Sequence, residues 1–181
     1  MIYRSEEVER NGNMRIAELM SVAVRTAPKA CGVDAIEVMV IDGDDKNKLT
    51  AAMREIGNEV GEDFFARDAG NVDDCHCIVL VGVDASPRLL DCGLCGVKNC
   101  EAAAKGGIPC VLAVSDLGIA IASAAATAMD HRSDNRILYS AGMAALRLKL
   151  FNDKVKVCYG IGLSAFGKNI FFDRESSHEE D

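Results

Sequence analysis

Four cysteines lie within nineteen residues of this chain, at the spacing C-x2-C-x4-C-x9-C. They are Cys92, Cys95, Cys100 and Cys110. Gly93 and Gly96 directly follow the first two, and glycine gives a short loop the freedom to turn tightly. Four thiolates in such a loop are the ligands that a [4Fe-4S] cluster or an all-cysteine zinc site requires. The spacing therefore predicts a metal centre.

The spacing also bears on which metal is bound. All-cysteine zinc sites usually contain two C-x2-C pairs separated by a longer spacer. This segment has a single C-x2-C pair, and its fourth cysteine follows Pro109. Three close cysteines and a more distant fourth beside a proline resemble iron–sulfur ligation. The pattern favours a [4Fe-4S] cluster and leaves zinc and free thiols as alternatives.

Four further cysteines stand outside this segment: Cys31, Cys75, Cys77 and Cys158. Cys75 and Cys77 flank His76 at the start of an apolar run, and strand alternation predicts both thiols on one face. We interpret them as core cysteines rather than ligands. The polar, acidic N-terminus lacks the features of a signal peptide, so the eight cysteines predict reduced thiols or ligands in a cytoplasmic protein.

Length and charge limit the remaining possibilities. A chain of 181 residues predicts one domain with room for a small insertion. The net charge of −8 argues against nonspecific nucleic-acid binding, which needs a basic surface. The most apolar stretch, Leu117 to Met129, is too short to span a bilayer, so no membrane partner is expected.

Hydrophobic periodicity predicts alternating helices and strands. Helices are expected at 12–26, at 44–60 behind a cap at Asp44 or Asp45, at 116–130, and after a cap at Asp134. Strands are expected at 35–41, 77–83 and 154–163. The helix over 116–130 is apolar nearly all round, which predicts a place in the core or a subunit interface and hence a homodimer.

These elements predict an α+β body from residues 1–84 and 111–174. Residues 85–110 form a cysteine-rich insertion in it, and residues 175–181 form a disordered acidic tail.

Several stretches beside the cysteine motif resemble a family of uncharacterised prokaryotic proteins that contain a ferredoxin domain. They are Arg25-Thr-Ala-Pro-Lys29 with Gly32-Val-Asp34, Phe64 to Ala69, Asp116 to Ala120, Asp130 to Asn135, and Gly167 to Arg174. The resemblance implies a compact [4Fe-4S] domain, in which the last cysteine usually follows a longer gap than the nine residues before Cys110. It implies no specific activity.

A weaker resemblance is to the FMN-dependent nitroreductase fold. The helix ending at Arg25-Thr-Ala-Pro, the later Asp116-Leu-Gly118 and the final strand with Gly160-Ile-Gly162 carry it. It implies a nitroreductase-like sheet-and-helix body with FMN between two subunits. Candidates for holding the flavin are Arg25, Lys29, Gly160, Gly162 and Lys168. The arginine-rich N-terminal segment of that family is reduced here to Arg4-Ser5.

Two functions follow from these patterns. One is a redox or electron-transfer protein with a [4Fe-4S] cluster, a flavin and a redox partner. The alternative is a non-catalytic module in which zinc or a cluster holds a loop for a partner. No nucleophile and base stand at a spacing that indicates a catalytic pair, so no catalytic residue is predicted.

Overall fold

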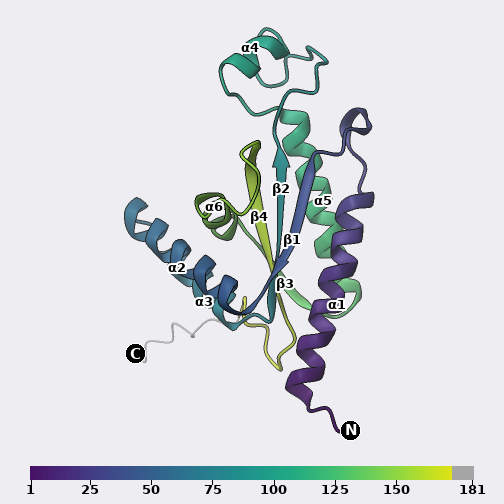
Figure 1. Cartoon of the computed structure of the whole chain (residues 1–181), viewed down its shortest axis with the longest axis vertical. Coiled ribbons are helices and arrows are strands. Elements are labelled where there is room, and N and C mark those ends of the chain that lie inside the picture. Colours follow the sequence, from purple (N-terminus) through teal and green to yellow (C-terminus); the bar gives the residue numbers. More distant parts are fainter. Residues whose placement is uncertain (173–181) are drawn as a thin grey trace, which may run out of the picture.

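A four-stranded antiparallel sheet in the order β1-β2-β4-β3 forms the centre of the computed structural model, which describes residues 1–172 (Figure 1). The strands are β1 (Ile36–Ile41), β2 (Cys77–Asp84), β3 (Asp134–Leu138) and β4 (Val155–Ser164). The strand predicted at 77–83 is β2, and it pairs with β1 on one side and β4 on the other. Its first seven residues are buried, which explains why the sequence reads as a continuous apolar run.

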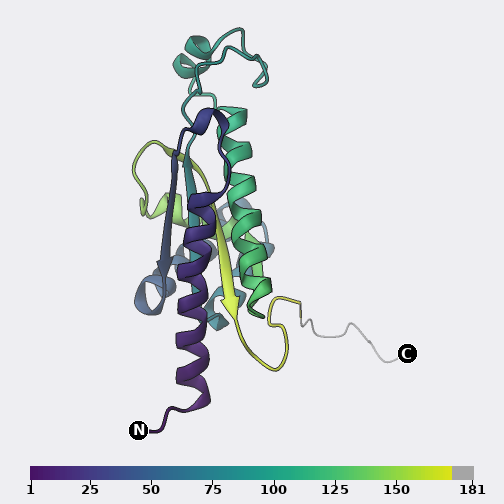
Figure 2. The same cartoon turned by 90° about the vertical axis from the view of Figure 1, so that its right-hand side faces the viewer.

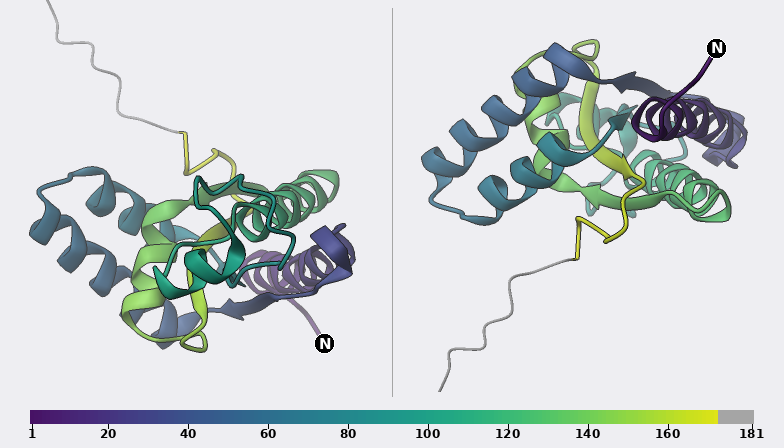
Figure 3. Two further views of the ribbon diagram at one scale, coloured as in Figure 1. Left: turned by 90° about the horizontal axis from the view of Figure 1, so that it is seen from above. Right: turned by 90° about the horizontal axis from the view of Figure 1, so that it is seen from below.

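Helices cover both faces of the sheet, as the end-on views show (Figure 3). One face is covered by α1 (Ser5–Thr26) and α5 (Val111–Asp130). The other is covered by α2 (Gly43–Val60), α3 (Phe64–Asp74) and α6 (Tyr139–Arg147). Each helix turns an apolar stripe toward the sheet, so the chain has two hydrophobic cores separated by the strands.

The helix predicted behind a cap at Asp134 is wrong in its first turn. Asp134 begins β3, and Ile137, predicted to point inward, is 44% exposed. The strand forms because residues 134–138 pair with residues 160–164 of β4, and this long-range pairing outweighs the local helical pattern. The helix starts only at Tyr139, and its buried residues include the predicted Ala141, Ala144 and Ala145.

The helices differ from the prediction in three further ways. The first helix begins at Ser5 rather than residue 12, and the negative charges of Glu6 and Glu7 in its first turn interact favourably with the helix dipole. The residue before α2 is Asp42, so neither Asp44 nor Asp45 is its cap. The helix α3 was not predicted, although its inward residues Phe65, Ala69 and Val72 recur at helical spacing.

The apolar helix α5 is longer than the 13-residue stretch considered in the sequence. Its 20 residues reach the length and hydropathy of a membrane span, so length alone does not exclude one. Its buried side, however, packs on the sheet and on α1 in the way of a core helix. Its outward side carries exposed Ile119 and Met129.

Residues 85–110 lie outside this body and project beyond the end of β2 (Figure 1). They contain one short helix, α4 (Cys100–Lys105). The segment is closed at its neck, where the Cys110 backbone N–H donates to the Ala85 carbonyl at 2.9 Å. The predicted tail, 175–181, lies outside the described residues.

Candidate metal centre

All four cysteines of the projecting segment line one small cavity. Its walls include Cys92, Cys95, Cys100 and Cys110. Ala103 of α4 and Val111 of α5 complete an apolar floor. The sulfurs thus come from the loop, from the first residue of α4 and from the residue just before α5. The fourth cysteine, whose spacing departs from the expected pattern, faces the same cavity as the other three.

The backbone of the loop has the conformations that its glycines allow. Gly93 and Gly96 have φ angles of 71° and 77°, and the Gly96 N–H donates to the Gly93 carbonyl at 2.9 Å. These are left-handed conformations that side chains with a Cβ rarely adopt. Leu89 and Asp91 also have positive φ, which is uncommon outside glycine and indicates a backbone held by its surroundings.

Asp91 fixes the loop at the sulfur of Cys100. Its Oδ1 accepts the backbone N–H of Cys100 at 2.7 Å, and its own N–H points to the Cys100 Sγ at 3.4 Å. Asn99 caps α4, because its side-chain oxygen accepts the N–H of Ala102 at 2.9 Å. Both contacts orient Cys100, and an N–H aimed at a ligand sulfur is a feature that adjusts cluster potentials.

Cys110 directly precedes the N-terminus of α5, and the residue is 9% exposed. Burial tends to raise the pKa of its thiol, but the backbone amides of Ala113, Arg88 and Leu112 and the Arg88 charge outweigh burial and lower it. None of these amides forms a well-defined cap hydrogen bond to the sulfur. Their combined field still favours a thiolate, the form that binds metal.

The core cysteines have the opposite chemistry. Burial raises the pKa of Cys75 to about 11 and the pKa values of Cys77 and Cys158 to about 12. They therefore remain protonated near neutral pH and pack as small apolar groups. The prediction that Cys75 and Cys77 share one face is wrong, because Cys77 packs under α1 and α5 while Cys75 packs with the other core. Cys75 ends α3 instead of belonging to β2, so strand alternation does not apply to it.

The cavity is small, about 20 Å³. Zinc binds thiolates at 2.3 Å, so four sulfurs around it would lie about 3.8 Å apart. Among residues 1–172, no three Cys, His, Asp or Glu side chains are gathered closely enough to hold a metal ion. The preference for a [4Fe-4S] cluster over zinc therefore rests on the spacing of the cysteines.

The cations predicted for a flavin do not meet within one chain. The Arg25 guanidinium donates to the Ile36 carbonyl at 3.0 Å and to Asp34 at 2.5 Å, near the end of β2, since Ile36 pairs with Val83. The Lys29 ammonium is buried and donates to the Val24, Arg25 and Ala27 carbonyls at the end of α1. Both side chains are engaged in closing the α1–β1 connection.

Lys168 follows β4 at the opposite end of the sheet. The segment before it returns beside the start of β2, where Phe166 stacks on His76 with ring centroids 4.8 Å apart. Eight residues of β2 separate the two ends, roughly 23 Å at about 3.3 Å per residue. One phosphate therefore cannot contact both Arg25 and Lys168 of the same chain.

The two predicted glycines serve packing instead of lining an open cleft. Gly160 and Gly162 are buried in β4. A Cβ on Gly160 would lie 2.8 Å from the Ala141 Cβ of α6, and one on Gly162 would lie 3.2 Å from the Phe171 ring. Both positions are covered by side chains, so neither glycine offers its backbone to a phosphate.

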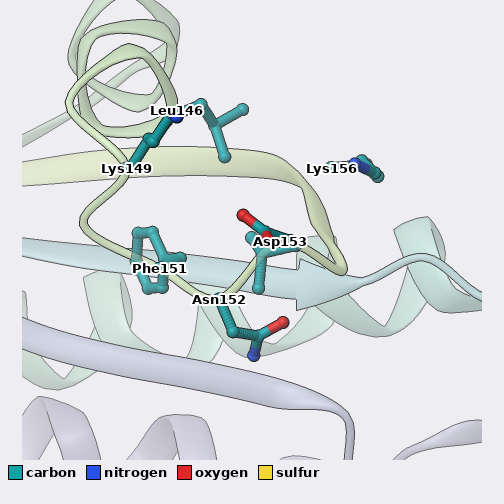
Figure 4. Close-up of a pocket in the computed structure, with 7 residues that line it drawn as sticks. Leu146, Lys149, Phe151, Asn152, Asp153 and Lys156 are labelled. Carbon is teal, nitrogen blue, oxygen red and sulfur yellow. The ribbon is translucent and has the colours of Figure 1, made fainter.

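Several hollows of the body are possible ligand sites, and two of them combine cationic side chains with an aromatic ring. One, of about 420 Å³, lies near the start of β2 and is lined by Arg10, Lys46, Asn47, His76 and Phe166, among others. The other lies at the turn between α6 and β4, where Lys149, Phe151 and Asp153 surround it (Figure 4). None of the predicted site residues lines either of these two hollows.

Several residues that were not predicted hold or surround the cysteines of this site. Asn99 could have been found, because it precedes a helix start in the position of an N-cap. Asp91 stands next to Cys92 but reaches Cys100, which spacing does not reveal. Arg88 and Asp116, both buried near Cys110, are 28 residues apart and meet only in the fold.

The chain is similar to proteins whose function is not described. Residues 106–174 match a family described as "uncharacterized protein containing a ferredoxin domain". This match includes Cys110 but not the first three cysteines of the motif. A relative from Archaeoglobus fulgidus, described only as an uncharacterized protein, is 34% identical over 96% of this chain and 98% of its own length.

Solved structures confirm the predicted nitroreductase-like fold. The NADPH:FMN oxidoreductase of Vibrio harveyi, complexed with NAD+, has a TM-score of 0.57 at 11% identity. The comparison covers 86% of this chain, which spans 60% of that protein. A nitroreductase family protein of Clostridium novyi has a TM-score of 0.56 at 13% identity, with 87% and 73% of the chains covered. A Desulfitobacterium hafniense nitroreductase with bound FMN has a TM-score of 0.51 at 15% identity, with 93% and 81% covered. At these identities the similarity shows the fold.

Proposed function

The chain belongs to the family of uncharacterized proteins that contain a ferredoxin domain, and from that premise we propose that it is an iron–sulfur redox protein. Cys92, Cys95, Cys100 and Cys110 would hold one [4Fe-4S] cluster, which supplies one-electron chemistry when bound. The observation that carries the proposal is the single cavity lined by all four cysteines. The lowered pKa of Cys110 and the amide aimed at Cys100 support thiolates there.

Metal analysis of protein purified without air tests this function. We expect about four irons per chain, the number in such a cluster, with its visible absorbance. Stoichiometric zinc without iron would contradict the redox proposal and favour the alternative, a module whose metal holds the loop for a partner. Exclusion of air matters because exposed thiolates oxidise readily.

The tip of the projecting segment is suited to a redox partner. Cys92 is exposed, and Leu89, Leu90 and Leu94 next to it are largely exposed as well. Apolar side chains around a centre that lies close to the surface favour brief docking of another electron carrier. All eight cysteines are free, in keeping with a reducing compartment such as the cytoplasm.

We also propose FMN as a second cofactor, because the fold is that of flavin-binding nitroreductases. The hollow lined by Lys46, Arg10 and Phe166 has cationic side chains for a phosphate and an aromatic wall for a planar ring. It lies at the same end of the sheet as Lys168, since Phe166 contacts His76. The resemblance to nitroreductases also implies a role for Arg25 and Lys29 in binding the flavin phosphate. These two residues could contact it only from a partner subunit.

Substitution of Lys168 tests where the flavin phosphate binds. We expect Lys168→Ala to weaken FMN binding by about 1–3 kcal/mol, the scale of a lost charge-assisted hydrogen bond. Lys105→Ala is the matched control and should leave FMN affinity unchanged, because this exposed lysine pairs with Glu101 on the projecting segment. Titration of each protein with FMN measures the effect. A wild type without saturable binding would remove the flavin from the proposal.

A homodimer is proposed from the outward face of α1 and α5, which lie side by side (Figure 2). Leu19, Val22, Ile119 and Met129 are 45–68% exposed on this face. A second copy would remove these apolar side chains from water. We expect sedimentation at micromolar concentration to show a dimer, and Ile119→Lys to shift it toward monomer. Ile137→Lys, equally exposed but on β3, is the control, and a monomeric wild type would contradict the proposal.

A further inference from the structure

Arg88 is a buried cation at the base of the cysteine loop. Its side chain is only 4% exposed. One terminal nitrogen, Nη1, donates to the Ser86 carbonyl at 3.0 Å. Within the described chain, its Nε and Nη2 are buried without a hydrogen-bond partner. Buried guanidinium groups are costly unless paired, so an arginine left in this state calls for an explanation.

Asp116 of α5 is the nearest opposite charge, but it forms no hydrogen bond with the Arg88 guanidinium and neutralises its charge only in part. The Asp116 side chain is 5% exposed, and its Oδ2 lies 3.9 Å from the Arg88 Nη2, too far for a hydrogen bond. That oxygen has no partner within the described chain, whereas Oδ1 accepts the Ala30 N–H at 2.8 Å. The carboxylate is therefore anchored to the turn after α1 and leaves part of the Arg88 charge unopposed.

Arg88 also lies close to Cys110. The Arg88 backbone amide lies beside the Cys110 sulfur, and its guanidinium acts on that sulfur electrostatically. Asp116 lies on the same helix that begins at Cys110, six residues further along. The remaining charged side chains of the segment, Asp91, Lys98, Glu101 and Lys105, lie on the loop and α4, where solvent screens them. The buried pair thus dominates the field on the body side of the cavity.

We propose that Arg88 and Asp116 form a positioning pair that sets the reduction potential of the centre held by the four cysteines. This inference rests on the proposed cluster. Reduction adds one electron from a donor and no proton, so the centre becomes more negative by one charge. A buried cation behind Cys110 favours that reduced form, and Asp116 limits how strongly it does so. The orphan donors of Arg88 are an arrangement that an anionic centre nearby would stabilise.

Opposite shifts of the potential test the pair. We compare wild type with Arg88→Gln and Asp116→Asn as holoproteins, titrated without air with dithionite and mediators. Arg88→Gln should lower the equilibrium constant for reduction about tenfold. This is the effect of one charge roughly 12 Å from the centre at an effective dielectric constant near 20. For one electron this corresponds to about 59 mV. Asp116→Asn, which keeps an oxygen for the Ala30 N–H, should shift the constant the other way.

Further variants separate charge from folding. Arg88→Lys keeps the positive charge and should restore a potential near that of wild type. Arg147→Gln and Glu59→Gln alter an exposed ion pair and should leave the potential unchanged, because solvent screens that pair. If iron analysis shows no cluster in wild type, the proposed function fails. If iron is present and both central variants shift the same way, or neither shifts, the pairing inference alone is overturned.

Discussion

Protein carrying Cys110→Ala, purified without air, will contain three or fewer irons per chain where the wild type contains about four. The substitution removes one of four thiolates from the cavity and leaves one corner of the cluster without a protein ligand. Iron analysis and the visible spectrum measure the loss. Cys110 is the informative position, because its spacing departs from the expected pattern while it lines the same cavity as the other three cysteines.

Cys31→Ala is the matched control for this experiment. Cys31 is exposed in the turn after α1 and does not line the cavity, so its loss should leave iron content unchanged. Cys158→Ala provides a second comparison, because this buried thiol has a pKa of about 12 and remains protonated. A Cys110→Ala protein with a full complement of iron would show that the fourth ligand is another group.

Gly142→Ala will destabilise the fold by about 3 kcal/mol or more, beyond the usual cost of overpacking. A Cβ at this position of α6 would lie 1.8 Å from the Cys158 carbonyl oxygen and 2.9 Å from the Tyr159 Cα, both in the backbone of β4. A central strand cannot move away without breaking its pairing with β2 and β3. A domain of this size has only about 5–15 kcal/mol of stability, so the loss is a large share.

Urea unfolding of the metal-free protein measures this effect independently of the cluster. Gly70→Ala is the control, because a Cβ there meets nothing within 4 Å in the interior of α3. It should stabilise the protein by about 0.4–1 kcal/mol, through better helix propensity and a less flexible unfolded chain. Equal midpoints for Gly142→Ala and wild type would show that α6 does not pack on β4 as closely as described.

Much of the fold could be predicted from the sequence, because its signals are local. The continuous apolar run of β2 and the apolar periodicity of α2 and α5 reflect burial on two faces or on one stripe. The cysteine motif also indicates its chemistry directly, since spacing and neighbouring glycines specify a short loop around a small centre.

Long-range contacts decided the rest. Residues 134–138 have a helical pattern but form a strand, since β4 offers them backbone partners that no local signal announces. Cys75 and Cys77 have similar neighbours in sequence yet enter different cores, because Cys75 is the residue that follows α3 and Cys77 is the first residue of β2. Arg25 and Lys168 are both cationic and both stand near the end of a helix or strand, so the sequence does not distinguish them as phosphate ligands. The pairing of the strands shows that they lie at opposite ends of β2.

The same distinction between local signals and long-range contacts applies to the candidate metal centre. Ligand type and spacing are local properties, so the sequence alone is enough to predict four thiolates in one segment. The position of Cys110 next to α5 and Arg88, and the 3.9 Å separation of Arg88 from Asp116, become visible only when the chain is folded. The strength of such interactions depends on burial and distance, which arise when segments far apart in sequence pack together.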